Sequence, residues 1–112
     1  MNIELTSKAD ALICSLYKKY LERLQSGDTE SKARFFGSSE IVRSEIVPSW
    51  NFGDVDETCK QLSRADLMTC LCADDIVYSN LKFTDLGVIY MEKRFERNLL
   101  KILDYIKKIP FL

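Results

Sequence analysis

Histidine is absent from this 112-residue chain, which also has only two prolines, four glycines and four cysteines. Without histidine, the chain lacks the commonest general base and the commonest metal ligand of proteins. No apolar run approaches the roughly 18 residues that would span a bilayer, and the first residues do not resemble an export signal. We therefore expect no membrane association, and reduced cysteine thiols in a cytoplasm.

Neither sign of charge is in excess, since 16 Lys and Arg face 17 Asp and Glu for a net charge of -1. The distribution is uneven: residues 38–85 carry nine acidic and four basic side chains, whereas residues 86–112 carry three acidic and six basic ones. A general polyanion binder would show a basic excess. The hydrophobic fraction of 46% is ordinary for a globular fold, and we expect one domain over residues 1–112.

Hydrophobic spacing and capping residues predict an α+β chain that is mostly helical and has one small β-hairpin. Asp54 and Glu57 form a capping-box pattern, and Val55, Cys59 and Leu62 then share one helix face. Phe35 and Phe36 end a polar loop and suit a short edge strand. The expected elements are helices over residues 7–26, 39–47 and 54–65, strands over 68–72 and 76–83, and a long C-terminal helix over about 85–109 that begins after Thr84.

Two stretches carry a resemblance to a known family. Leu62-x4-Leu67-Met68 precedes the predicted hairpin, and Leu81-x-Phe83-Thr84-Asp85-x-Gly87-x-x-Tyr90-Met91 follows its tip. Together they resemble the C-terminal half of winged helix-turn-helix regulators, although Ala65-Asp66 and Phe83 stand where Gly and Leu are usual. The resemblance covers about residues 7–109. It implies a winged helix, a bacterial or phage origin and a role in transcription regulation without catalysis.

In that family the helix matching residues 54–65 enters the major groove, and the hairpin is a wing that touches DNA. The resemblance therefore makes DNA a candidate partner. The candidate DNA contacts are Arg43, Lys60, Gln61, Arg64 and Lys82.

Carboxylates occupy positions where a DNA-binding protein would carry Lys or Arg side chains. Asp54, Asp56 and Glu57 crowd the first turn of the predicted recognition helix, and Asp74-Asp75 form the tip of the wing. These side chains would face a polyanion at close range. The competing hypothesis is a protein partner for an acidic helix and wing surface. The residues leave both hypotheses open.

The C-terminal helix carries the strongest interaction signal, a heptad-like apolar seam. The seam suits either a homodimer or packing on helix 7–26 of the same chain. We expect a mixture, in which the first half packs within the chain and the end packs against a second copy. Basic side chains of the same helix either face solvent or meet DNA in a dimer. The candidate interface residues are Phe95, Leu99, Ile102, Ile106 and Ile109.

No motif for catalysis or a cofactor is found. Cys70 and Cys72 lie on one face of a strand, because successive side chains point to opposite faces. This arrangement suits core thiols better than a zinc knuckle, and no histidine is present to activate them. The aspartate pairs lie at a predicted helix start and turn, where Asp is favoured in any case. Trp50 is expected to anchor the turn before helix 54–65. The sequence therefore predicts no enzyme activity, no cofactor and no metal.

Overall fold

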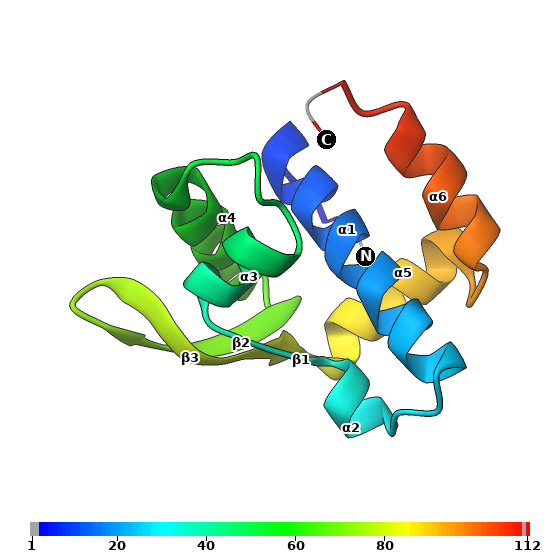
Figure 1. Cartoon of the computed structure of the whole chain (residues 1–112), viewed down its shortest axis with the longest axis horizontal. Coiled ribbons are helices and arrows are strands. Elements are labelled where there is room, and N and C mark those ends of the chain that lie inside the picture. The colour runs from blue at the N-terminus through cyan, green and yellow to red at the C-terminus, as the bar shows by residue number, and fades with distance from the viewer. Residues whose placement is uncertain (1–2, 111) are drawn as a thin grey trace.

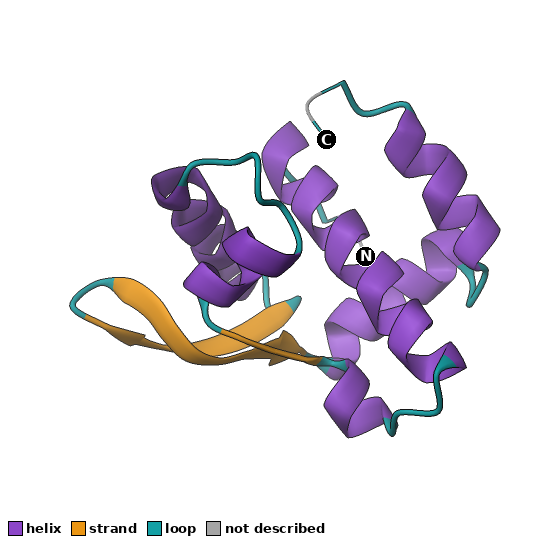
Figure 2. Cartoon of the chain, viewed as in Figure 1, coloured by secondary structure: helices purple, strands orange, loops and turns teal. Residues whose placement is uncertain are grey.

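The computed structural model describes residues 3–110 and residue 112. It confirms an α+β chain that is mostly helical (Figures 1 and 2). No helix in the described part combines the length and the apolar character needed to cross a membrane. The elements are α1 (Ser7–Gln25), α2 (Glu30–Ala33), β1 (Phe35–Gly37), α3 (Ser39–Glu45), α4 (Phe52–Arg64), β2 (Met68–Ala73), β3 (Ile76–Phe83), α5 (Asp85–Phe95) and α6 (Leu99–Lys107).

The three strands form one antiparallel sheet in the order β1-β3-β2. β2 and β3 are the predicted hairpin, and Phe35 of β1 pairs with Lys82 of β3. The short strand at Phe35 and Phe36 is thereby confirmed. Figure 1 shows the hairpin extending away from α1, α5 and α6, with α3 and α4 along one side of it.

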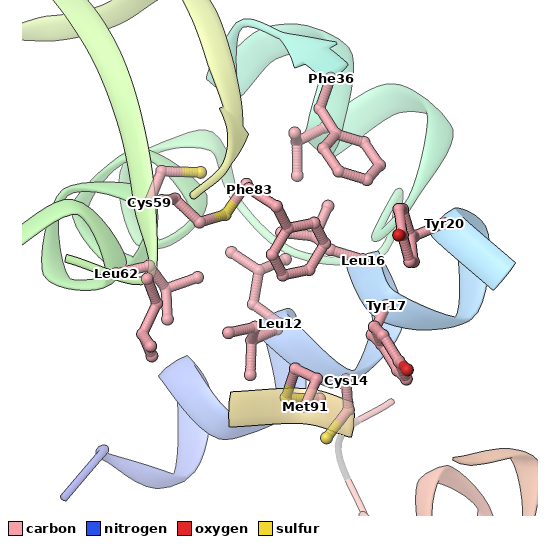
Figure 3. Close-up of a cluster of buried hydrophobic side chains, with 14 of the residues drawn as sticks. Leu12, Cys14, Leu16, Tyr17, Tyr20, Phe36, Cys59, Leu62, Phe83 and Met91 are labelled. Atoms are coloured by element: carbon pink, nitrogen blue, oxygen red, sulfur yellow. The ribbon is translucent and has the colours of Figure 1, made fainter. Parts of the chain in front are cut away.

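The core lies where α1 crosses the base of the sheet (Figure 3). Leu12 and Leu16 of α1 are fully buried there. Tyr20 of α1 and Phe36 of β1 both pack against the Phe83 ring, each with its centroid 5.9 Å from that of Phe83. These contacts hold β1 and the end of β3 against α1, which leaves the tip of the hairpin outside the core.

Small polar side chains set the helix starts. Thr84 accepts a hydrogen bond from Gly87 N, which confirms it as the predicted N-cap of α5. Asn51, rather than Asp54, caps α4 by accepting from Asp54 N. The helix therefore begins earlier than predicted, because an asparagine can accept a hydrogen bond from the backbone three residues on.

The predicted long C-terminal helix over 85–109 is wrong, because the chain breaks between α5 and α6. Glu96 ends α5 with φ 57° and ψ -158°, a conformation used almost only by glycine. Its carbonyl oxygen accepts a hydrogen bond from the Tyr17 hydroxyl of α1 at 2.6 Å. Asn98 then caps α6 through Lys101 N, and this asparagine is the signal in the sequence that marks the break.

The break folds α6 back onto α1. Asp10 of α1 binds both elements. Its Oδ1 lies 2.6 Å from Nη1 of Arg94 on α5, and its other oxygen accepts a hydrogen bond from the Tyr105 hydroxyl of α6. The predicted interface residues thereby contact the chain's own core. Phe95 and Ile102 are buried in it, and Leu99, Ile106 and Ile109 are partly buried and pack against it. The apolar seam is therefore used within the chain.

Replacing Glu96 by glycine should stabilise the protein. Glycine adopts the observed backbone conformation without strain, and the ion pair lost with Lys101 is exposed. We expect Glu96→Gly to raise the midpoint of thermal unfolding by roughly 3–5 °C, measured by circular dichroism. Lys93→Gly, an exposed site within α5, is the control and should lower it. A lower midpoint for Glu96→Gly would contradict the assignment of strain.

Candidate interaction face on α4 and the β2–β3 hairpin

The buried face of α4 is the one that the sequence predicts. Val55, Cys59 and Leu62 are all fully buried against the rest of the chain. Trp50, in the turn before the helix, is also buried, and the Lys8 ammonium lies 4.7 Å from the centroid of its ring. The expectation that Trp50 anchors this turn is therefore confirmed.

Asp56 is the main departure from the predicted surface of α4, because its side chain points inward and is only 6% exposed. Its carboxylate accepts hydrogen bonds from the Ser39 hydroxyl at 2.8 Å and from Val77 N at 2.9 Å. Lys60 Nζ lies 3.1 Å from its other oxygen, and 3.8 Å from a carboxylate oxygen of Asp75 at the hairpin tip. This network joins α3, α4 and β3.

The charges of this network reinforce one another. Burial alone would raise the pKa of Asp56, but the hydrogen bonds from Val77 N and Ser39, together with Lys60, lower it below its ordinary value. The pKa of Lys60 is raised, first by its hydrogen bond to Asp56. Asp56 therefore holds the hairpin against α4 as a carboxylate.

The other two predicted DNA contacts on α4 also have partners within the chain. Arg64 Nη2 lies 2.9 Å from Glu57 Oε1, and the Thr6 hydroxyl donates to Gln61 Oε1 at 3.0 Å. Lys60, Gln61 and Arg64 do lie close together on α4. Each nevertheless has an acceptor or donor of its own protein, which a phosphate would have to displace.

Arg43 and Lys82 lie apart from that group. Arg43 is on α3, and its Nε donates to Trp50 O at 3.2 Å. Lys82 is near the end of β3 opposite the tip, where it pairs with Phe35 and Thr69. The five predicted DNA contacts are therefore spread over three elements.

The hairpin tip, Asp74-Asp75, turns the chain with positive φ at both residues, 50° and 63°. Aspartate tolerates this conformation better than most residues. With the tip lies a group of exposed apolar side chains, here called the hairpin patch: Leu71 (54% exposed), Ile76 (41%) and Tyr78 (63%). Sequence reasoning missed this patch, although the alternation along β3 with buried Val77 between Ile76 and Tyr78 is its signal.

The four cysteines do not share one environment. Cys14 and Cys59 are buried, and burial raises the pKa of each thiol to about 12. Cys70 is half-buried and Cys72 is exposed, so the expectation of a core thiol is wrong for Cys72. Within residues 3–110 and 112, no cluster of three or more Cys, Asp or Glu has a geometry that could hold a metal ion.

The chain matches no protein-family model, no curated protein and no solved structure. The candidate face is therefore defined by its own geometry: an internally paired α4, an acidic hairpin tip and the hairpin patch.

Proposed function

We propose that this chain is a winged-helix protein without catalytic activity, and that the face formed by α4 and the β2–β3 hairpin binds a protein. From α1 to β3 the order is helix, short helix, strand, helix, helix, strand, strand. It supports the winged helix, with α3 and α4 as the tandem helices and β2–β3 as the wing.

One observation carries the choice of a protein partner. The exposed apolar side chains of this face are gathered on the wing, whereas the basic side chains of α4 are paired with the chain's own carboxylates. A DNA-binding surface needs several basic side chains that are free to reach phosphates. Protein interfaces instead have apolar and aromatic side chains at their centre and a polar rim. The hairpin patch beside Asp74 and Asp75 fits the second description.

Duplex DNA is the second candidate, and the position of Lys60, Gln61 and Arg64 on one helix favours it. Arginine and glutamine on a recognition helix can read base edges. For that function Lys60 would have to leave Asp56 and Asp75, and Arg64 would have to leave Glu57.

A salt titration with random-sequence duplex DNA separates the two candidates. We expect fluorescence anisotropy to show no binding by the natural chain at physiological salt, because its α4 bases are already paired. The double variant Asp74→Lys, Asp75→Lys should bind at low salt, since it replaces two negative charges at the tip by two positive ones. Binding of the natural chain that Arg64→Ala weakens by about tenfold or more would instead establish DNA as the partner.

Site-directed photocross-linking tests the protein partner itself. A benzophenone side chain in place of Tyr78 should capture a defined protein in the cells that naturally produce this chain. Ile89 on α5 is 45% exposed and is the matched control, at which no capture is expected. Equal capture from both positions would mean that the wing has no special role.

A further inference from the structure

β2 is an edge strand that lacks the usual protection. In the part of the chain that the structure describes, the sheet order β1-β3-β2 leaves one side of β2 without a neighbouring strand. Natural edge strands are commonly protected by a charged side chain, a proline or a bulge. The sequence of β2, Met68–Ala73, contains no charged residue, proline or glycine. In both irregularities of its pairing with β3, the extra residue belongs to β3, so β2 runs regularly along the edge.

The two faces of β2 differ in what they border. Leu71 points to the exposed side with the hairpin patch, while Cys70 and Cys72 line a hollow on the side of α4. The α4 side chains that line the same hollow are Lys60, Ser63 and Arg64. A strand added at this edge would lie beside uncharged β2 residues and would end near the basic side chains of α4.

We propose that the edge of β2 pairs with β2 of a second copy of this chain, antiparallel and centred on Leu71. The inference rests on the proposed function, because it names a partner for the wing. Pairing of the two strands supplies main-chain hydrogen bonds to the open β2 edge of each copy. With a two-fold axis through Leu71, both copies use the same surface in the interface.

The centred register matches side chains on both faces. Leu71 meets Leu71 of the second copy on the outer face, which covers part of the hairpin patch. Thr69 lies opposite Ala73 of the second copy, so no charged side chain stands among the paired residues 69–73. On the α4 side, Cys70 lies opposite Cys72 of the second copy. Opposed residues of antiparallel strands have Cα atoms about 4.5–5.5 Å apart.

The charges at the ends of β2 favour a second copy as the occupant. β2 turns back directly from α4, so Arg64 lies near its Met68 end, whereas Lys60 lies near the tip and Asp75. In the centred register the acidic tip of each copy extends past Met68 of the other, towards its Arg64. The Arg64–Glu57 ion pair is solvent-exposed, so Arg64 can exchange Glu57 for the tip of the second copy, while Asp66 at the same end is exposed to solvent. Arg64 and the acidic tip thereby bring opposite charges together at both ends of the paired strands.

Sedimentation velocity over a range of protein concentrations tests the pairing. The natural chain should form a dimer, and Leu71→Lys should weaken it by about tenfold or more, because a charge on an edge strand opposes pairing. Leu100→Lys is the matched control: Leu100 is 73% exposed on α6, and its substitution should leave the dimer unchanged. A chain that remains monomeric overturns the inference, as does a dimer that withstands Leu71→Lys.

Cysteine cross-linking tests the register. Under mild oxidation Cys70→Ser and Cys72→Ser should each give little covalent dimer, because like cysteines are then offset by two residues and lie beyond the roughly 7 Å that a disulfide can bridge. Mixing the two variants restores one Cys70–Cys72 pair across the interface and should produce the covalent dimer. No gain on mixing would overturn the register. If the chain stays monomeric while benzophenone at Tyr78 still captures a different protein, the pairing fails and the proposed function stands. If neither a dimer nor a captured protein is found, the proposed function fails as well.

Discussion

Gly87→Ala is expected to destabilise the protein severely. A Cβ atom at this position of α5 would lie 2.0 Å from Leu67 O and 2.9 Å from Leu67 C, both backbone atoms. Leu67 O accepts a hydrogen bond from Thr84 N at 3.1 Å, so the carbonyl cannot move away without losing that bond. Phe83 Cδ1, at 3.0 Å, closes the remaining side. We expect a loss of about 3 kcal/mol or more in the free energy of unfolding.

Chemical denaturation of the variant measures this loss, and Gly53→Ala is its control. The Cβ atom added at Gly53 of α4 would have Asn51 Oδ1 as its nearest neighbour, at an ordinary contact distance of 3.5 Å. Alanine is also the better helix former, so we expect no loss and a gain of up to about 1 kcal/mol. If Gly87→Ala were as stable as Gly53→Ala, α5 would not approach Leu67 as closely as the structure has it.

Asp56→Ala is the second substitution with a large expected effect. It removes the acceptor of the Val77 N–H and of the Ser39 hydroxyl in a buried position, and leaves Lys60 without its closest partner. An unsatisfied buried donor costs its desolvation penalty, and the Val77 N–H becomes one, whereas the Ser39 hydroxyl can still donate to Val77 O at 3.0 Å. Together with the lost pairing of Lys60, this gives an expected loss of about 2–4 kcal/mol. The loss should be concentrated in the hairpin, and faster hydrogen exchange at Val77 N would show it.

The pH dependence separates the charge of Asp56 from its hydrogen bonds. Asp56→Asn keeps a carbonyl oxygen for Val77 N but loses the charge that faces Lys60, so its loss should be smaller than that of Asp56→Ala. The pKa of Asp56 is lowered in the folded protein. Its contribution to the free energy of unfolding is therefore complete above the unfolded pKa of about 3.9, and it is lost as the pH falls from there through the lower pKa of the folded state. The stability difference between the natural chain and Asp56→Asn should therefore shrink in acid. A difference that stayed constant from neutral to acidic pH would contradict the lowered pKa.

The local elements were predictable because their signals are local. Periodic apolar residues identified α1 and α4, Thr84 identified the start of α5, and the alternation around Asp74-Asp75 identified the hairpin. The break at Glu96 was not predicted, because the apolar spacing continues across it. The Tyr17 hydroxyl that binds the Glu96 carbonyl comes from the other end of the chain.

The candidate face was predictable only in part, for a similar reason. Sequence reasoning placed Lys60, Gln61 and Arg64 together on one helix, which the structure bears out. It also placed Asp56 on the surface, because a carboxylate near a helix start is ordinarily solvated. Asp56 is buried only because Ser39 and Val77, distant in sequence, supply the hydrogen bonds that it needs.

The sequence by itself determined the mostly helical α+β class, the hairpin, the charge distribution and the buried stripe of α4. These depend on residue types at short spacing, which set the local backbone preference and the face that must leave water. Only the tertiary structure decided that the C-terminal apolar seam covers α1, that the α4 bases are paired within the chain, and that the edge of β2 stays open. Each of these features depends on which distant segment covers an apolar face, pairs with a charge or completes a backbone hydrogen bond. Those partners are brought together only when the whole chain packs.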